Sequence, residues 1–473
     1  MKKKLKTLVV TMLIVAIAVS CCGCITGRIY GKPLDEATAL DVSQGVLYLE
    51  QITVYMQEHD LESIQKMGYH YGKAGAAEFD DFWQDYLDLE EEYGAITDRN
   101  LSESYSYADC PAFVGELITE SGATLMLQMY FSASYELYRL HIYLSAEDAE
   151  AKVSMPEDVT EIDVVLNEGG EFELPGKITL PAGAMEEGKP LTAAVLVGGD
   201  GANTMDMDAG NTHMYRDLAW DLAQQGIVTL RFDKRTLVWS DVALDENADI
   251  SVFTVDWEYI DDANAAAAML AELPYVDAEN IWYIGHSQGA QMAARADEEA
   301  GGLYAGFVLI NTSPRNWAEV IYDQYINYGL CDRDYDQIYY LVSKIDTEKK
   351  FILEGSCAKM REDEMTTTFI LSRAAGFWVD YMSYDYVQGL KDLAKPTLIL
   401  QGEADYQITR EVDFTAWEQE LEGCAWASLQ CFEGLNHLMT PSGGVFEGHY
   451  KEFDIPGCVP EAVGEAIASF MGQ

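Results

Sequence analysis

From Ile162 onward, short apolar runs alternate with stretches of helical spacing, and this alternation constrains the fold more than any other feature. The runs are AAVLVGG, IVTLRFD, IWYIGHS, GFVLIN, TLILQG and ASLQCFE. Runs that are apolar throughout are typical of strands buried on both faces of a sheet. Parallel strands joined by helices have right-handed crossovers, so that helices cover both faces. We therefore predict an α/β fold with a mostly parallel sheet, preceded by a hairpin around Gly169 and Gly170.

The chain before this segment has a different pattern. LDVSQGVLYLEQITVYMQEHDLESIQKM and EFDDFWQDYLDLEEEYG carry apolar residues at helical spacing, whereas residues 112–145 alternate apolar and polar residues around Gly122 and a turn at 132–135. A chain of 473 residues also exceeds what one hydrophobic core usually serves. We predict a small α+β domain over residues 24–145, an acidic linker over 146–161 and an α/β domain over 162–473.

The first 23 residues predict an export signal, because a lysine-rich start precedes an apolar stretch and then small residues. The apolar stretch, residues 8–19, is shorter than the ~20 residues of a permanent membrane span. Gly23 followed by Cys24 resembles a bacterial lipobox, and Cys21 after Ser20 is a competing site. We expect a lipid anchor at Cys24 (or Cys21) on the outer face of the cytoplasmic membrane, with plain secretion as the alternative.

The charge balance argues against nucleic acid as a partner. The chain has 80 acidic and 30 basic residues, so a phosphate backbone would be repelled. Six cysteines remain after Cys24, and none has the spacing of a zinc site. The glycine-rich stretch GGDGANTMD lacks the G-K-[ST] ending of a phosphate loop and the spacing of a dinucleotide site. We therefore expect neither a metal nor a cofactor, and the pairing of the six cysteines stays open.

The stretch GHSQG predicts a nucleophile at Ser287. A run that reads as a strand precedes it, and QGAQMAARADEE reads as a helix after it. Gly285 and Gly289 have no side chain where a sharp strand-to-helix turn would crowd the backbone. An isolated match to this short pattern is more often a turn serine, so the prediction depends on this context and on a base and an acid downstream.

A serine nucleophile needs a histidine base and a carboxylate that orients it, and in this kind of sheet they follow in the order serine, acid, histidine. Glu403, Asp405 and Asp413 follow the run TLILQG, and Asp405 has the best loop length. His437 directly follows the run ASLQCFE, whereas His449 follows no strand and is the minor alternative. Asp405 and His437 are therefore the predicted acid and base.

Acyl transfer also needs two N–H donors for the oxyanion. The residue after the nucleophile, Gln288, would supply one. The glycine-rich turn after the run AAVLVGG would supply the other, from Asp200 or Gly201. A carboxylate at Asp200 would oppose a developing negative charge unless it points away.

Together these positions resemble the α/β-hydrolase superfamily, in particular exported bacterial serine esterases related to dienelactone hydrolase and prolyl-oligopeptidase-type hydrolases. The resemblance covers about residues 162–473 and rests on VLVGGDGANTMD, YRDLAWDLAQQGIVTLRFDKRT, GHSQGA, LQGEADYQIT and LNHLM. It implies an α/β-hydrolase fold with Ser287 as nucleophile, Asp405 as acid, His437 as base, and Asp200 and Gln288 as oxyanion donors. It also implies that Asp233, Lys234 and Arg235 form a structural ion-pair turn.

The N-terminal part resembles, through its element order, the small nuclear-transport-factor-like domain that precedes the hydrolase in some bacterial proteins. Between GFVLIN and TLILQG lies an aromatic-rich segment, about 313–392, which we predict to be a helical lid. Each single aromatic residue in it is expected to pack between helices.

The function expected from these features is hydrolysis of small carboxylic esters by a lipid-anchored serine esterase. An acyltransferase or a peptidase with the same triad is the alternative within enzymes. A surface ligand-binding lipoprotein with a degenerate hydrolase domain is the alternative from another class.

Overall fold

The computed structural model describes residues 39–67, 74–107, 110–131, 136–186, 190–240, 253–332, 335–365, 368–443 and 450–472. The predicted export signal and both candidate lipidation sites, Cys24 and Cys21, lie outside these residues. Within them, no helix is both long enough and apolar enough to cross a membrane.

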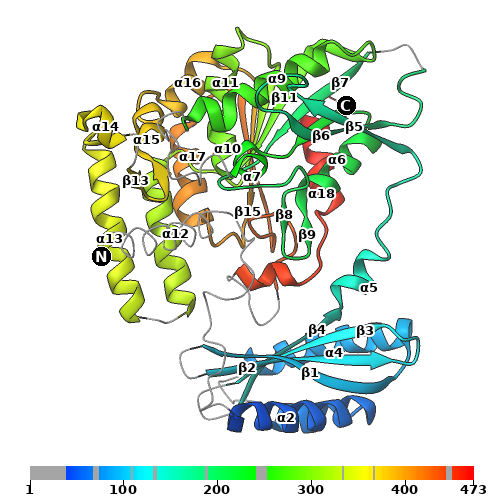
Figure 1. The fold of residues 1–473 in the computed structure, drawn as a ribbon. Helices are drawn as coiled ribbons and strands as arrows, with labels where there is room; N and C mark the ends of the chain where they lie inside the picture. Colours follow the sequence, from blue (N-terminus) through cyan, green and yellow to red (C-terminus); the bar gives the residue numbers. More distant parts are fainter. Residues whose placement is uncertain are drawn as a thin grey trace.

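The N-terminal part is an antiparallel sheet packed against helices, which confirms the α+β layout (Figure 1). Its helices are α2 (Ala39–Gln57), α3 (Leu61–Met67) and α4 (Ala74–Tyr93). Its strands are β1 (Ile96–Tyr107), β2 (Cys110–Thr119), β3 (Thr124–Phe131) and β4 (Leu137–Leu144), and they pair in sequence order. Residues such as Ile52, Phe82 and Leu127 fill a core of its own between helices and sheet.

Strand β1 has no counterpart in the predicted meander, which begins at residue 112. Its sequence, ITDRNLSESYSY, is polar and lacks the alternation that predicts a half-buried strand. It lies at the edge of the sheet, where β2 supplies its ladder partners. The first predicted helix is also interrupted in the structure. His59, with a φ of 56°, lies between the end of α2 and the start of α3.

The second part is an eight-stranded sheet that has the strand order of the α/β-hydrolase fold and confirms the predicted fold class. The order is β16-β15-β12-β11-β7-β10-β6-β5. The strands are β5 (Val159–Leu166), β6 (Leu174–Pro181), β7 (Leu191–Val197), β10 (Val228–Phe232), β11 (Val276–His286), β12 (Gly306–Ile310), β15 (Thr397–Gly402) and β16 (Ala427–Phe432). Six neighbouring strands of this sheet pair in parallel, namely β16, β15, β12, β11, β7 and β10. Strand β6 pairs antiparallel with β10 and also with β5, with which it forms the predicted hairpin.

Alternate residues of the parallel strands face two different cores, because successive side chains of a strand point to opposite faces. In β7, Val195 and Val197 belong to one core, whereas Ala194 and Leu196 belong to the other. Helices α9 (Asp261–Ala271) and α11 (Ala293–Glu299) contribute to the first core, and α6 (Met214–Gln224) and α18 (Glu461–Phe470) to the second. Strands buried on both faces explain why the runs are apolar throughout.

Helix α5 (Ala146–Glu150) and the first residues of β5 lie within the segment predicted as a linker. Glu150 accepts a hydrogen bond from Arg216 Nη1 of α6 at 2.7 Å, so this segment contacts the second part of the chain. The domain boundaries proposed from the sequence stay predictions.

The segment between β12 and β15 is mostly helical, as predicted. It contains α12 (Trp317–Asp332), α13 (Tyr335–Leu353), α14 (Glu362–Met365), α15 (Ala375–Tyr381) and α16 (Tyr386–Leu393), which gather at one side of the sheet (Figure 1). It also contains an unpredicted hairpin, β13 (Phe369–Ile370) and β14 (Arg373–Ala374). Trp317, Trp378 and Tyr381 are buried in the adjoining core, which confirms that these aromatic residues pack between elements.

Candidate active site

Ser287 lies where β11 ends and α10 (Ser287–Gln291) begins. Its φ is 53°, a left-handed conformation that non-glycine residues rarely adopt. Neighbouring glycines make this turn possible. A Cβ on Gly285 would lie 2.5 Å from Ala290 Cα, and one on Gly289 would lie 2.2 Å from Gly198 O. The strained backbone presents the serine at the carboxyl end of the parallel strands, where sites occur in such sheets.

Asp405 and His437 come from the loops after β15 and β16, and the structure brings them together. His437 Nδ1 lies 2.7 Å from Asp405 Oδ2, and both residues are buried. The other carboxylate oxygen of Asp405 accepts from the backbone N–H groups of Gln407 at 2.8 Å and Ile408 at 3.0 Å. With Nδ1–H donating to the carboxylate, the neutral imidazole carries its acceptor lone pair on Nε2.

Two side chains that the sequence did not single out for this task hold the backbone of His437. Asn311, directly after β12, donates from Nδ2 to His437 O at 2.8 Å and accepts at Oδ1 from Gly402 N at 2.8 Å. His286 Nε2 lies 2.8 Å from the same carbonyl. Burial holds the pKa of His286 well below its ordinary value, so the ring is neutral and donates from Nε2. His286 is fully buried and tethers the loop of the candidate base.

The alternative acids have other partners. Glu403 pairs with Arg410 at 3.0 Å, and Asp413 pairs with Arg315 at 2.8 Å and accepts from Thr409 N at 2.8 Å. The alternative base, His449, lies outside the described residues. Among the candidate acids and bases that the structure describes, the hydrogen-bonded pair is Asp405 and His437.

The glycine-rich turn after β7 lies directly against Ser287. A Cβ on Gly199 would lie 2.9 Å from Ser287 Cβ and 3.1 Å from His286 Nδ1, so there is no room for a side chain at this position. Asn203 Nδ2 donates to Gly199 O at 3.0 Å and to Asp200 O at 3.1 Å, which fixes the turn. Gly199, the residue before Asp200, is thus placed directly against the serine elbow.

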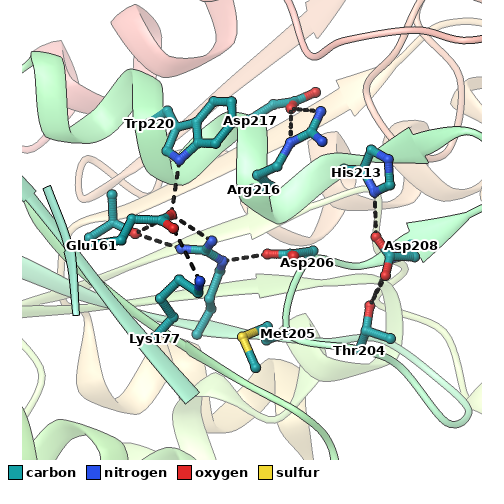
Figure 2. A network of polar contacts seen from close by, with 12 residues as sticks. Glu161, Lys177, Thr204, Met205, Asp206, Asp208, His213, Arg216, Asp217 and Trp220 are labelled. Atoms are coloured by element: carbon teal, nitrogen blue, oxygen red, sulfur yellow. Dashed lines mark hydrogen bonds and ion pairs between the residues drawn. The ribbon is translucent and has the colours of Figure 1, made fainter. Parts of the chain in front are cut away.

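The chain that leaves this turn is held by the polar network in Figure 2. Arg231 of β10, 1% exposed, donates to Asp206 Oδ1 at 2.7 Å and to Glu161 Oε1 at 2.8 Å. Thr204 Oγ1 donates to Asp208 Oδ2 at 2.7 Å, and Asp208 Oδ1 lies 2.5 Å from His213 Nδ1. The turn is therefore anchored to the strands behind it.

The carboxylate of Asp200 belongs to a buried charge cluster of four residues, which we define as Asp200, Lys234, Glu258 and Arg373. Arg373 forms ion pairs with both carboxylates, and Lys234 Nζ lies 2.7 Å from Glu258 Oε1. Lys234 also donates to Gly199 O at 2.6 Å. Burial raises the pKa of Asp200, while the Arg373 guanidinium opposes that rise. Burial alone would raise the pKa of Glu258, but Arg373 and Lys234 lower it below its ordinary value.

In the Asp233, Lys234 and Arg235 turn, Lys234 and Arg235 form ion pairs with other elements, whereas Asp233 accepts a backbone hydrogen bond. Asp233 Oδ1 accepts from Met205 N at 2.7 Å, and Arg235 pairs with Asp262 of α9 at 2.7 Å. Lys234 reaches the glycine-rich turn itself. Glu258 and Arg373 were not predicted as parts of the site, because they lie far from the recognisable motifs and meet them only through the fold.

Among the residues the structure describes, no cluster of three or more histidine, cysteine, aspartate or glutamate side chains could hold a metal ion. What the arrangement offers is a buried Asp–His pair, a serine in a strained elbow and an adjacent glycine-rich turn. These are the groups needed for nucleophilic catalysis on a carbonyl carbon.

Comparison with known proteins places the chain beside esterases. No profile of an established protein family matches it. It is 33% identical over 316 residues to esterase EstD of Thermotoga maritima, a match that covers 67% of this chain and 68% of the relative. Among solved structures, Est1E from Butyrivibrio proteoclasticus aligns at 13% identity over 65% of this chain and 97% of that chain, with a TM-score of 0.38. Pyrococcus horikoshii acylaminoacyl peptidase aligns at 12% identity over 81% and 57%, with a TM-score of 0.40.

Proposed function

This chain belongs to the family of α/β-hydrolase esterases that includes esterase EstD, and from this premise we propose that it cleaves small carboxylic esters through Ser287, His437 and Asp405. The observation that carries the assignment of residues is the buried 2.7 Å hydrogen bond between His437 and Asp405. The two residues follow adjacent strands, β15 and β16, and the backbone of His437 is tied to His286, the residue before Ser287. A histidine oriented by a buried carboxylate is what a serine needs to become a nucleophile.

In the proposed reaction, Ser287 Oγ attacks the ester carbonyl carbon while its proton passes to His437 Nε2. Asp405 stabilises the imidazolium that forms. The backbone N–H groups of Gln288 and Asp200 stabilise the oxyanion. The alcohol leaves with the proton from His437, and the acyl group stays on Ser287. Water then attacks the acyl-enzyme with His437 as base, which releases the carboxylic acid and restores the serine.

The test is hydrolysis of p-nitrophenyl acetate and butyrate together with labelling by a fluorophosphonate. We expect Ser287→Ala to abolish labelling and to lower kcat by about 10⁴-fold or more, since the members of such a triad act as a unit. Ser313→Ala is the matched control, because Ser313 is also buried, lies just after β12 and is outside the triad. We expect this variant to label and turn over like the parent. Labelling of Ser287→Ala at the parental rate would overturn the proposal.

Two further measurements separate the alternatives. Faster cleavage of peptide p-nitroanilides than of esters would identify a peptidase, and acyl transfer to an added alcohol in preference to water would identify an acyltransferase. A protein that binds glycans or peptides tightly without any turnover would be a binding protein with a degenerate hydrolase domain.

We further propose that the protein is exported and anchored to the membrane through lipid at Cys24 (or Cys21), on the basis of the N-terminal sequence. Incorporation of radiolabelled palmitate should be lost when Cys21, Cys22 and Cys24 are all replaced. A triple variant that stays in the membrane fraction would rule out the anchor.

A further inference from the structure

Asp200 and Gln288, the two residues expected to donate to the oxyanion, are joined by one side chain from the segment between β12 and β15. Arg373 of β14 forms an ion pair with Asp200, and its Nη2 donates to Gln288 Oε1 at 2.5 Å. Its Nη1 forms an ion pair with Glu258. Arg373 is 8% exposed, so these contacts are made away from bulk water.

The hairpin that carries Arg373 has a strained backbone. Leu371 and Ser372 form the two-residue turn of the β13–β14 hairpin, with φ values of 45° and 63°. Such turns favour asparagine and glycine, because other residues are strained at positive φ. Glu348 of α13 accepts from Leu371 N at 2.9 Å, and Trp378 Nε1 donates to Ile370 O at 2.6 Å, so the hairpin is held by its surroundings. Strain that the surrounding structure maintains in this way is characteristic of functional positions.

The charges explain why an arginine is needed here. Asp200 and Glu258 contribute two negative charges, and Lys234 and Arg373 contribute two positive charges, so the charge cluster is neutral as a whole. Without Arg373, a buried carboxylate would remain uncompensated beside the place where the reaction develops negative charge. Like charges at short distance in a buried site are strongly unfavourable.

We propose that Arg373 is a positioning residue of the oxyanion site: it neutralises Asp200 and, together with Tyr259, holds the Gln288 side chain. Tyr259 supports this role by donating to Gln288 Oε1 at 2.8 Å. The inference rests on the proposed function, and it assigns to the segment between β12 and β15 a part in completing the site. Arg373 acts through these two residues and takes no part in bond making.

The experiment is a double-mutant cycle on ester hydrolysis with Arg373→Met and Asp200→Asn. We expect Arg373→Met to lower kcat by about 100-fold, the size of effect seen when an oxyanion donor is lost, with KM changed less than about threefold. Asp200→Asn removes the uncompensated carboxylate, so adding it to Arg373→Met should restore kcat by about tenfold or more. An unchanged kcat in Arg373→Met, or a folded double variant with no recovery, would overturn the inference.

Arg295→Met is the matched control. Arg295 is equally buried, pairs with three carboxylates (Asp256, Glu299 and Asp380), and also ties the segment between β12 and β15 to the body of the fold. A general loss of stability should affect both arginine variants, but Asp200→Asn should rescue only the Arg373 variant. Rescue of both would show a structural role and overturn the inference.

If Arg373→Met alone does not fold, the same question is answered in the Asp200→Asn background. There, adding Arg373→Met should cost less than about tenfold in kcat, and a larger loss would overturn the inference. Failure of the proposed function would look different: the parent itself would not hydrolyse esters, or Ser287→Ala would remain active. An active parent with inactive Ser287→Ala and fully active Arg373→Met would overturn the inference alone.

Discussion

Single residues at the serine elbow are constrained mainly by space. Ser287 has a left-handed backbone, and the chains around it approach so closely that Gly199 and Gly289 leave no room for a Cβ. The same closeness brings the backbone of the glycine-rich turn to the serine. The geometry that the chemistry needs is therefore set by residues that have no side chain.

Gly199→Ala should impair activity more than stability. Its Cβ would lie 2.9 Å from Ser287 Cβ, so the turn would have to move away from the serine. A misplacement of this kind can cost about 100-fold in rate, and we expect kcat for p-nitrophenyl acetate to fall by about that factor.

Gly443→Ala is the control, because a Cβ there meets nothing within 4 Å and its φ is not in the left-handed region. Its kcat should match the parent. If Gly199→Ala has the kcat of the parent, the position of the turn against Ser287 is not needed for activity.

At the scale of elements, buried ion pairs connect strands and helices to the site. Arg231 of β10 joins β5, through Glu161, to the loop that follows the glycine-rich turn, through Asp206. Helices α6 and α18 pack together with several carboxylates near their contact. The ion pairs of Arg231 stabilise the fold, whereas the carboxylates near the contact of α6 and α18 destabilise it when they are ionised.

Arg231→Met should destabilise the protein by about 3–5 kcal/mol, because two carboxylates lose their buried partner. Urea unfolding followed by tryptophan fluorescence measures this. Lys391→Met is the control, since it breaks a largely exposed pair with Glu420 and should cost at most about 1 kcal/mol. Equal losses of stability in the two variants would contradict this role for Arg231.

Asp221→Asn should stabilise the protein more at pH 8 than at pH 5. Burial, reinforced by Asp217, Glu461 and Glu465, raises the pKa of Asp221 to about 7. A carboxyl whose pKa is higher in the folded than in the unfolded state contributes stability that is full below the unfolded pKa of 3.8 and is lost as pH rises from there through about 7. Because Asp221 is partly exposed, we expect a gain of only about 1–2 kcal/mol at pH 8.

Thermal unfolding at the two pH values measures this effect. Asp163→Asn, at a side chain that is 89% exposed, is the control and should show no such pH dependence. An equal change in Tm at pH 5 and pH 8 for Asp221→Asn would be inconsistent with a raised pKa.

At the scale of the whole molecule, the excess of acidic residues dominates the electrostatics. The formal net charge is −50, so self-repulsion opposes the compact state. The ion pairs at the site are buried and are screened little by salt, whereas repulsion between surface carboxylates is screened strongly.

We therefore expect Tm to rise by several degrees when NaCl is increased from about 20 to about 200 mM, since the Debye length shortens over this range. An uncharged osmolyte at equal osmolality controls for solvent exclusion and should give a smaller rise. A fall in Tm with salt would mean that attractive surface ion pairs outweigh the repulsion.

The sheet and the candidate triad could both be predicted from local sequence patterns. Apolar runs predict buried strands, and all six predicted strands are present, although β16 lies at the edge of the sheet and is only partly buried. Ser287, Asp405 and His437 each follow such a run within a few residues, and parallel strands bring their carboxyl ends to one edge. Local pattern was sufficient here because each position depends on its own strand.

The surroundings of these residues could not be predicted in this way, because they depend on how distant segments pack. The polar edge strand β1 has no pattern of its own and exists because β2 pairs with it. Arg373 and Glu258 are 115 residues apart and form an ion pair through packing of the segment between β12 and β15. The carboxylate of Asp200, beside the serine elbow, is paired with that same distant arginine. Burial and long-range charge pairing are properties of the folded chain, and no local sequence pattern encodes them.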